Sequence, residues 1–296
     1  MIEISTVALF SVLGCGLCYA GSDFTRKLAG QFCAPTLLTA IIFTTIIPIY
    51  LTLFFLSDNF HFSNGYIVPG TLNALSNLIA NILFVRSVTL SPLSKTIPLL
   101  SLTPVFTAII GYFFLGEFLS LFQWLGVSFV VLGILWLYTP DKKAFNLFAI
   151  WQNFIAEKGA KYMCYVAFFW TLAPVFDRIA LRHTNVATHA LIHFTIVASL
   201  LWLWLFIRGR LKKSEMPDRK HWKTIGILAL LYAGALGLQM LSLTMIYVGI
   251  VESVKRVIGQ ISSIIFGRIA FNEPLTKGKI LGVLTMCAGV PLIILG

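Results

Sequence analysis

Charged residues are scarce in this chain. Asp, Glu, Lys and Arg make up 11% of its 296 residues, whereas 58% are hydrophobic and the mean hydropathy is +0.90. Soluble domains carry roughly 25% charged residues. This composition excludes a sizeable soluble domain, and it argues against a nucleic-acid-binding surface even though the formal net charge is +11. The excess of Lys and Arg is typical of cytoplasmic loops in membrane proteins, and contact with anionic lipid or substrate is the alternative.

Motifs of several enzyme classes are also missing. The chain has no G-x-x-x-x-G-K-[ST] loop, no H-E-x-x-H and no G-x-S-x-G. These motifs hold the phosphates of a nucleotide, a catalytic zinc ion and an activated serine, respectively. We therefore expect neither an ATP-driven pump nor an enzyme, and we expect no cofactor.

Cysteine and histidine are few. Cys15 and Cys18 form a C-x-x-C inside an apolar segment, but no second pair accompanies it, so packing is favoured over redox or zinc chemistry. His189 and His193 are four residues apart without a third ligand nearby. Packing or modest proton sensitivity is therefore expected for them, and a metal site is not.

Long hydrophobic runs predict an all-α integral membrane protein. At ~20 residues per span, the chain has the length for about ten transmembrane helices with short loops. Pro92, Pro98 and Pro104 interrupt the fourth helix, so we expect it to be broken or bent, and we expect the same of the ninth. A short helix lying in the membrane interface is expected within 139–159. The ten predicted helices are residues 5–28, 33–57, 66–86, 92–115, 119–138, 160–181, 186–208, 223–247, 251–270 and 276–295.

A glutamate followed by two glycines, at separations of 9 and 16 residues, occurs twice in the chain. Duplication of this kind is common in transporters. Each half would hold an odd number of helices, so the second half must cross the membrane in the opposite sense. We predict two inverted five-helix repeats, 1–139 and 160–296, joined by the interfacial linker 140–159. The repeated residues are Glu117, Gly126 and Gly133 in the first half and Glu273, Gly282 and Gly289 in the second.

We expect these repeated residues to have structural roles, in helix capping and helix packing, and not a role in transport chemistry. Each glutamate opens a helix, and Pro274 after Glu273 suits a first helical turn. A carboxylate at that place accepts free backbone N–H groups, so capping is expected in preference to proton coupling. The glycines predict close packing of the fifth and tenth helices.

The loops differ in charge between the two halves. Residues 58–65 contain no Lys or Arg, whereas the equivalent loop 208–223 is dense with both. The positive-inside rule places 208–223, Lys142, Lys143 and Lys158 in the cytoplasm. That orientation puts both termini outside.

The repeated stretches resemble the EamA repeat of the drug/metabolite transporter (DMT) superfamily. That repeat has a proline in the fourth helix, a glutamate before the fifth and glycines within it. The resemblance covers nearly the whole chain and implies a ten-helix secondary transporter with a central cavity between the halves. It also implies cytoplasmic termini, opposite to the charge pattern, and it leaves the substrate open. The matching positions are Pro104, Glu117, Gly126 and Gly133, then Glu273, Gly282 and Gly289, with Gln260 where the second proline would fall.

Two helices carry polar faces with ionisable groups. Asp23 in the first helix is expected to pair with Arg26 or Lys27. Because charge facing lipid is costly, these faces should point into the bundle or toward water at a helix end. The alternative is that the charges mark helix ends and reach the interface. The candidate site residues on the first and sixth helices are Tyr19, Asp23, Arg26, Trp170 and Asp177.

The third helix bears a stripe of asparagines at steps of four: Asn73, Asn77 and Asn81. Such a stripe must meet water, substrate or another helix, and hydrogen bonding between helices is the alternative to a substrate contact. Gln239 is the one strongly polar residue near the middle of the equivalent eighth helix. We expect Asn77 and Gln239 to line the cavity.

Cations cluster where the fourth and ninth helices begin. Lys95 lies in the first cluster, and Lys255 and Arg256 lie in the second, where Glu252 is within reach of both. Cations are unfavourable at a helix N-terminus, so a carboxylate or a substrate anion should compensate them. We expect these residues to attract a carboxylate or phosphate, with snorkelling to the interface as the alternative.

The combined features predict a secondary active transporter, an exporter or exchanger, for a small anionic metabolite, working by alternating access. It would be a multi-pass protein of the plasma or inner membrane, a monomer or loose homodimer, with lipid around it. The driving force would be protons, through Asp23, Asp177 or Glu252, or the substrate's own gradient. The alternative is a translocase for a lipid or a lipid-linked substrate that bears phosphate. A membrane-embedded enzyme and a non-transporting scaffold have less support.

Overall fold

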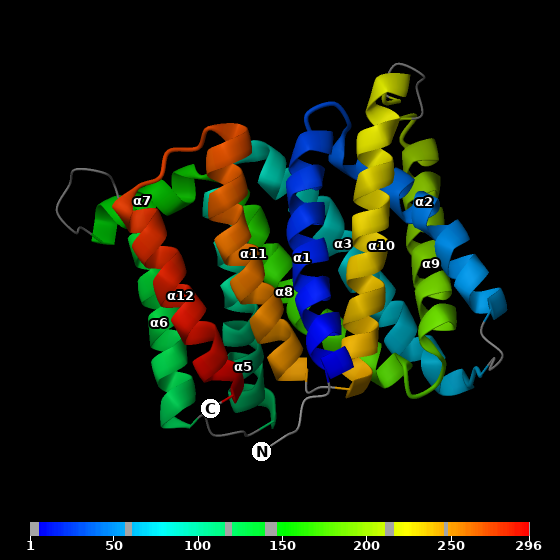
Figure 1. Ribbon diagram of the computed structural model, residues 1–296, viewed down its shortest axis with the longest axis horizontal. Coiled ribbons are helices and arrows are strands. Elements are labelled where there is room, and N and C mark those ends of the chain that lie inside the picture. Colours follow the sequence, from blue (N-terminus) through cyan, green and yellow to red (C-terminus); the bar gives the residue numbers. More distant parts are fainter. Residues whose placement is uncertain are drawn as a thin grey trace.

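The computed structural model describes residues 6–56, 61–115, 120–139, 147–210, 216–245 and 248–295. Within these ranges the protein is built from helices, and extended pairing is limited to one bridge between Phe62 and Thr184. Figure 1 shows the helices running side by side in one bundle. They are α1 (Thr6–Ala29), α2 (Pro35–Leu56), η1 (Asn64–Tyr66), α3 (Ile67–Leu90), α4 (Leu93–Thr96), η2 (Ile97–Ser101), α5 (Leu102–Leu115), α6 (Leu121–Leu137), α7 (Leu147–Ala156), α8 (Lys158–Ala180), α9 (Val186–Ile207), η4 (Arg219–His221), α10 (Trp222–Met245), α11 (Val248–Phe271) and α12 (Lys277–Leu295).

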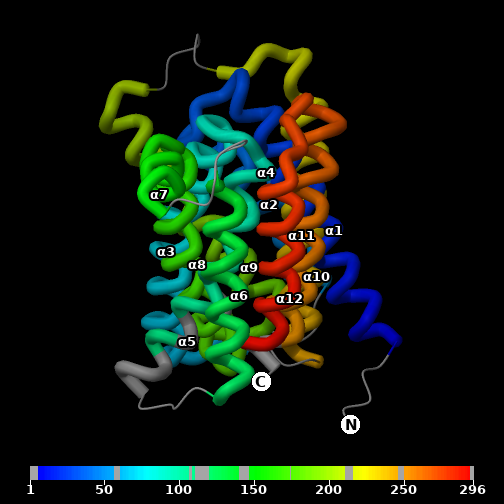
Figure 2. Tube along the Cα trace, turned by 90° about the vertical axis from the view of Figure 1, so that its left-hand side faces the viewer, coloured from blue at the N-terminus to red at the C-terminus, as the bar shows by residue number. Residues whose placement is uncertain are grey.

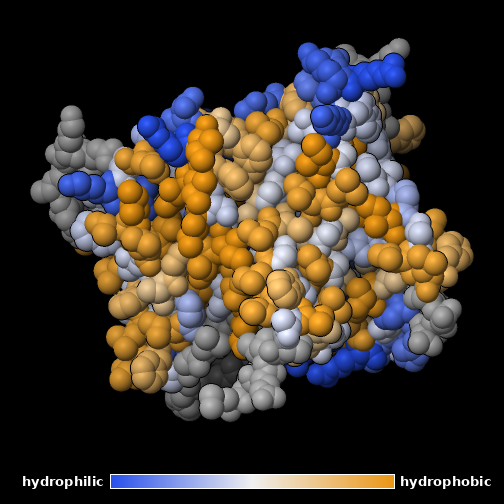
Figure 3. Space-filling model, viewed as in Figure 1, coloured by the Kyte–Doolittle hydropathy of each residue, from blue (hydrophilic) through white to orange (hydrophobic). Residues whose placement is uncertain are grey.

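Six of the described helices are long and apolar enough to cross a membrane. Large hydrophobic side chains are exposed on them and on their neighbours, as expected where the solvent is lipid. Figure 3 shows this apolar surface as a wide middle band, with hydrophilic residues gathered toward the two ends. The six are Thr6–Ala29, Pro35–Leu56, Asn64–Leu90, Lys158–Ala180, Val186–Ile207 and Arg219–Met245.

The predicted break in the fourth helix is confirmed. Between 93 and 115 the chain forms α4, the 3-10 segment η2 and then α5. Pro98 lies within η2, where a missing backbone N–H and a fixed φ disfavour a regular α-helical ladder. The ninth helix is expected to be broken or bent, and a break is wrong, because α11 is continuous over Val248–Phe271; a bend stays a prediction. Gln260 stands where a proline would interrupt it, and glutamine keeps its backbone donor.

The helices pair across the middle of the sequence. The most extensive contacts join α1 to α10, α2 to α9, α3 to α8 and α6 to α12, while α4 and η2 lie against α11. Each pair takes one helix from before α7 and one from after it. Figures 1 and 2 show α1 starting and α12 ending at one end of the bundle, with α7 at the other.

The glycines of the repeated motif lie where α6 and α12 cross. A Cβ atom added to Gly282 would lie 2.6 Å from the carbonyl oxygen of Gly133, and one added to Gly126 would lie 2.7 Å from that of Gly289. Separations this short leave no room for any side chain, so only glycine allows the two backbones to approach so closely. The predicted close packing of these helices is confirmed.

A short helix forms where an interfacial helix is expected. This helix, α7, covers Leu147–Ala156 and exposes Phe148 and Trp151, while Ile150 is buried. Phe154 packs edge-on against Tyr138, with ring centroids 5.2 Å apart. The position of α7 relative to a bilayer stays a prediction.

Candidate functional site

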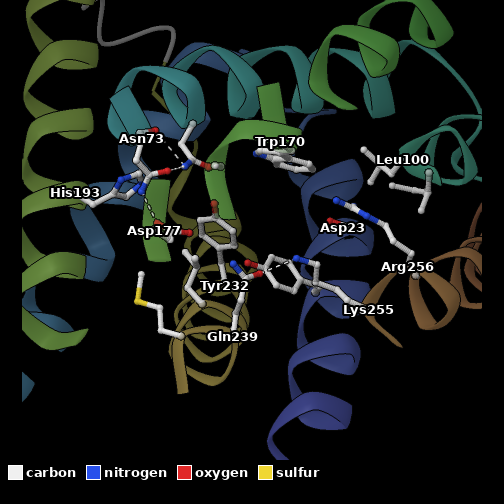
Figure 4. A pocket seen from close by; sticks show the side chains of 17 residues that line it. Asp23, Asn73, Leu100, Trp170, Asp177, His193, Tyr232, Gln239, Lys255 and Arg256 are labelled. Carbon is white, nitrogen blue, oxygen red and sulfur yellow. Dashed lines mark hydrogen bonds between the residues drawn. The ribbon is translucent and has the colours of Figure 1, made fainter. Parts of the chain in front are cut away.

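A cavity lies between the helices that precede α7 and those that follow it. Its empty space, counted together with the solvent at its open mouth, is about 800 Å³. Figure 4 shows its polar side chains converging from several helices. They come from α1, α3, α8, α9, α10 and α11, and η2 adds apolar residues. The lining residues are Tyr19, Asp23, Asn73, Asn77, Ile97, Leu100, Trp170, Ala173, Asp177, His193, Tyr232, Leu236, Gln239, Met240, Lys255, Arg256 and Gly259.

One wall of the cavity is cationic. The Nζ atom of Lys255 lies 2.5 Å from Oε1 of Glu252 and donates to Oε1 of Gln239 at 2.7 Å. Arg256 reaches the other oxygen of Glu252 at 3.2 Å. Glu252, which its spacing places within reach of either cation, pairs with both. Two cations therefore share one carboxylate, and Nε of Arg256 is buried without a hydrogen-bond partner.

Asp23 lies in the same region of the cavity, where its charge interacts with those of Arg26, Lys255 and Arg256. Its expected ion pair with Arg26 or Lys27 does not form at salt-bridge distance among the described residues. Lys27 instead pairs with Glu273 at 2.9 Å. Arg26 instead donates to Oδ1 of Asn81, on α3, at 3.0 Å.

The opposite wall carries an acidic group and imidazoles. Asn73 donates to Oδ1 of Asp177 at 2.5 Å, and Nε2 of His189 lies 2.9 Å from the same oxygen. His189 is fully buried behind the wall, and its Nδ1 atom lies 2.9 Å from the hydroxyl of Tyr66. His193, one turn along α9, lines the cavity and has an unpartnered Nδ1 atom. A metal-binding cluster is not found among the described residues.

The asparagine stripe is used in two ways. Asn77 lines the cavity and donates to Oδ1 of Asn73 at 2.6 Å, which turns the Asn73 amide group toward Asp177. Asn81, one turn further, accepts a hydrogen bond from Arg26 at 3.0 Å. The stripe therefore meets both the cavity and a neighbouring helix.

Arg26 forms a layer beside the cavity. Its guanidinium carbon lies 4.1 Å from the ring centroid of Tyr232 and 5.1 Å from that of Phe84. Asn81 accepts from both Arg26 and the Tyr232 hydroxyl. The Arg26 side chain is almost fully buried, and the faces of the two rings stabilise its positive charge by cation–π interaction where no carboxylate among the described residues forms an ion pair with it at salt-bridge distance.

Beyond that layer, Glu273 closes a second network. Its carboxylate accepts the backbone N–H groups of Leu93 and Ser94, at 2.7 and 3.0 Å, as well as the Ser94 hydroxyl and the ion pair from Lys27. Glu273 is thus a helix cap, but the prediction that it caps the helix it opens is wrong: it caps α4, and at the start of α12 the Thr276 hydroxyl accepts from the backbone N–H of Lys279. Glu117 lies outside the described residues.

Most of the predicted site residues lie at this cavity or directly behind its walls. Tyr19, Asp23, Asn73, Asn77, Trp170, Asp177, Gln239, Lys255 and Arg256 line it. Arg26, Asn81 and Glu252 hold lining residues in place through the contacts given above. Lys95 is not among the described lining residues, and it pairs with Glu157 at 3.0 Å. A protein carboxylate therefore compensates this cation.

Sequence reasoning missed Tyr232, His193 and Met240 as lining residues and His189 as a buried partner of Asp177. The two histidines gave a signal, their spacing of four residues, but a pair of that spacing is equally common in packing. Tyr232 and Met240 gave none, because aromatic and sulfur side chains are ordinary in an apolar helix.

Comparison with known proteins identifies the family. The family model described as the EamA-like transporter family matches residues 6–139 and again 157–295. The chain belongs to the EamA-like transporter family. It is thus a multi-pass membrane transporter, which in a bacterium resides in the plasma membrane. Family membership also indicates a transporter in place of an enzyme.

Two relatives are transporters of Bacillus subtilis (strain 168). The uncharacterized transporter YoaV is 22% identical over 261 residues, covering 84% of this chain and 83% of YoaV. The uncharacterized transporter YwfM is 27% identical over 148 residues, which is 48% of this chain and 49% of YwfM. A crystal structure of a protein 14% identical superposes with a TM-score of 0.64 over 99% of this chain and 98% of that one. This last likeness shows the fold.

Proposed function

We propose that this EamA-like protein is a secondary active transporter that moves a small anionic metabolite by alternating access of the central cavity. The observation that carries the proposal is the cationic wall, where Lys255 and Arg256 share the single carboxylate of Glu252. Export or exchange is the proposed direction, with a monomer or loose homodimer as the working unit.

The proposed architecture has ten membrane-spanning helices in two inverted five-helix repeats, 1–139 and 160–296, with 140–159 as the interfacial linker. The helix pairs support it. In the proposed repeats α1 corresponds to α8 and α3 corresponds to α10, so the pair of α1 with α10 is equivalent to the pair of α8 with α3. The reciprocal glycine contacts of α6 and α12 have the same symmetry. The separate family matches to 6–139 and 157–295 add support.

Some proposed spans are not long, apolar helices. The segment of α4, η2 and α5 is broken, and α11 carries Glu252, Lys255, Arg256 and Arg268. Broken or charged helices are expected where they line a cavity in a transporter, because their polar groups then face water or substrate and not lipid. Both segments contribute residues to the cavity wall.

An anion suits the cationic wall for two reasons. The first is charge: the three cations Arg26, Lys255 and Arg256 face the two carboxylates of Glu252 and Asp23, so a positive charge is left over in a buried place, which is costly without a partner. The second is the buried and unpartnered Nε of Arg256. A carboxylate or phosphate group would supply the missing charge and the missing acceptor together.

Alternating access requires contacts that break and re-form between the halves. The bonds from Leu93, Ser94 and Lys27 to Glu273 join the two halves at the end of the bundle that holds α7. The layer of Arg26 and Tyr232 lies between this network and the cavity. We propose that this end opens when Glu273 releases α4, and that the structure represents the state closed at this end.

A thermal-shift screen of carboxylates, phosphates, amino acids and lipid-like phosphates on the purified protein identifies the substrate class. A ligand at about 100 times its dissociation constant stabilises the native state by ~2.7 kcal/mol. The best ligands are then tested for uptake into proteoliposomes. We expect anions to stabilise the wild type and Lys220→Ala, which removes an exposed loop cation, and to lose most of their effect in Lys255→Ala and Arg256→Ala.

Anion uptake that is unchanged in both cavity variants, at normal protein levels, contradicts the anion site. Stabilisation by lipid-like phosphates alone, with no effect of soluble anions, favours the translocase of a lipid-linked substrate. Stabilisation by neutral compounds alone contradicts an anionic substrate. Uptake of those compounds into proteoliposomes then tests whether the protein is a transporter.

A further inference from the structure

We propose that Asp177 and His189 form a proton-binding pair in the cavity wall, with Tyr66 as its relay toward the end of the bundle where α3 begins. The inference rests on the proposed transport function and names the site of its coupling ion. The three residues come from α8, α9 and the start of α3, and each contact between them is within hydrogen-bond distance.

The charge of Asp177 requires a partner. Within the described ranges its ion-pair partner is His189, at 2.9 Å, and neither Lys nor Arg lies within salt-bridge distance of it. Asp177 and His189 are both buried. An ionised carboxylate in such a place is costly unless a positive charge neutralises it. A proton bound by the pair supplies that charge without any change in the protein around it.

The hydrogen bonds accommodate both protonation states. The Asn73 amide group is oriented by Asn77, so its N–H points at Oδ1 of Asp177. That oxygen therefore accepts from Asn73 and from Nε2–H of His189. When His189 is neutral, the Tyr66 hydroxyl donates to its Nδ1 atom. When the imidazole gains a proton, Nδ1–H donates to the Tyr66 oxygen, and only the hydroxyl hydrogen has to turn.

Tyr66 lies on the side of the pair away from the cavity, since its hydroxyl contacts Nδ1 of His189 while Nε2 faces Asp177. This tyrosine lies in η1, next to the ring of Phe62, which is partly exposed. A nearby pair, Ser63 and His183, is hydrogen-bonded at 2.9 Å and less deeply buried. The hydrogen bonds therefore lead from Asp177 at the cavity through His189 to the hydroxyl of Tyr66, and the η1 segment that holds Tyr66 lies at the end of the bundle opposite α7 (Figure 1). The charge pattern of the loops assigns that end to the outside.

Other titratable groups surround the pair. His193 lies one turn along α9, with its ring 6.3 Å from that of His189, and α2 covers it with Phe43. Tyr19 of α1 and Glu252 of α11 interact with the charge of Asp177 across the cavity. The cations Lys255 and Arg256 lie on that far wall, paired with Glu252. Neither cation lies within salt-bridge distance of Asp177, whose ion-pair partner among the described residues is His189.

Asp177 touches both the relay and the cavity, and this couples them. A substrate that binds beside Asp177 changes the electrostatic environment of its carboxylate, and hence the proton affinity of the pair. By thermodynamic reciprocity, protonation of the pair changes the affinity for substrate by the same factor.

The test measures proton binding without a substrate. Protein reconstituted in lipid is titrated between about pH 8 and about pH 5, the range in which histidine titrates, and infrared difference spectra record the imidazole and carboxyl bands. We expect His189→Gln to remove one histidine signal from the difference spectrum, and Asp177→Asn to remove a carboxylate signal together with the same histidine signal. His61→Gln, at an exposed residue, should remove only its own histidine signal.

If the difference spectrum of His189→Gln keeps every histidine signal of the wild-type spectrum, His189 does not bind a proton in this pH range, and the proposal is overturned. If that variant does not fold, Tyr66→Phe carries the test, since it keeps the ring and removes only the hydroxyl. An unchanged titration in Tyr66→Phe overturns the relay. Failure of substrate uptake in the wild type would contradict the transport function and leave the proton titration standing, so the two failures are distinguishable.

Discussion

The carboxylate of Glu273 accepts the backbone N–H of Leu93 at 2.7 Å. A residue of the loop between α11 and α12 therefore caps a helix from the other half of the chain. The hydroxyl and backbone N–H of Ser94 and the amine of Lys27 also bind this carboxylate. Since the groups come from both halves, the network acts as a contact that transport has to break.

Glu273→Gln should lower the free energy of unfolding by about 2–4 kcal/mol. The substitution keeps the size of the side chain but leaves Lys27 without a counter-charge and the two backbone donors with a weaker acceptor. Thermal unfolding in detergent measures the change. Lys27→Gln is the matched control, because it removes the ion pair and keeps the cap, and its loss should be smaller. Equal losses in both variants would show that capping contributes nothing.

The same carboxylate predicts a dependence of stability on pH. Burial alone would raise the pKa of Glu273, but hydrogen bonds from Ser94 and Lys27 and the charge of Lys27 lower it below its ordinary value of 4.5. A group whose pKa is lower in the folded state stabilises the protein fully above its unfolded pKa, and that contribution disappears as the pH falls through the folded value. The wild type should therefore lose stability relative to Glu273→Gln as the pH drops below about 4.5. A constant difference between the two proteins down to about pH 3 would contradict this.

Gly282→Ala should destabilise the protein by about 1–3 kcal/mol, because the new methyl group would meet backbone atoms of α6 that cannot move independently. The added Cβ would lie 2.6 Å from the oxygen of Gly133 and 2.9 Å from the nitrogen of Leu137. Gly226→Ala in α10 is the matched control, since nothing lies within 4 Å of its added Cβ. That variant should be neutral or slightly stabilising, because alanine favours the helix. Similar unfolding midpoints for the two variants would contradict the close crossing.

Glu252→Gln tests the cationic wall from the side of its carboxylate. It removes the carboxylate that forms salt bridges with the buried Lys255 and Arg256, at a cost of about 3 kcal/mol. Inorganic phosphate should restore more of the unfolding midpoint in this variant than in the wild type, because the anion can replace the lost carboxylate. The double variant Glu252→Gln with Lys255→Ala carries one cation fewer, so phosphate should raise its unfolding midpoint by less than that of Glu252→Gln. Equal phosphate effects in all three proteins would show that no anion binds at this wall.

The sequence was sufficient to predict the parts of the fold that depend on composition and period. The long helices, the break around Pro98 and the crossing of α6 and α12 all follow from hydrophobic runs, from proline and from glycine spacing. A break in α11 was expected by analogy with the fourth helix alone, and no residue of α11 required it. Pattern reasoning works where one residue type has one structural consequence.

Partners that come from distant helices could not be predicted in the same way. Glu273 has the sequence context of a cap, but which helix it caps depends on the packing of α11 against α4. Lys27 and Asp23 are near neighbours on α1, yet Lys27 pairs with a residue 246 positions away. The role of His189 was missed for this reason, since Asp177 and Tyr66 meet it only in the folded bundle.

Arg26→Lys should lower stability by about 1–2 kcal/mol, because the planar guanidinium stacks on Tyr232 and Phe84 and a lysine amine cannot. Tyr232→Phe is the control: it keeps the aromatic face and removes only the hydroxyl that donates to Asn81. It should therefore cost less than Arg26→Lys. Thermal unfolding ranks the two variants. A larger loss in Tyr232→Phe would mean that the hydrogen bonds around Asn81, and not the stacking of a buried cation between two rings, hold this layer between the cavity and the Glu273 network.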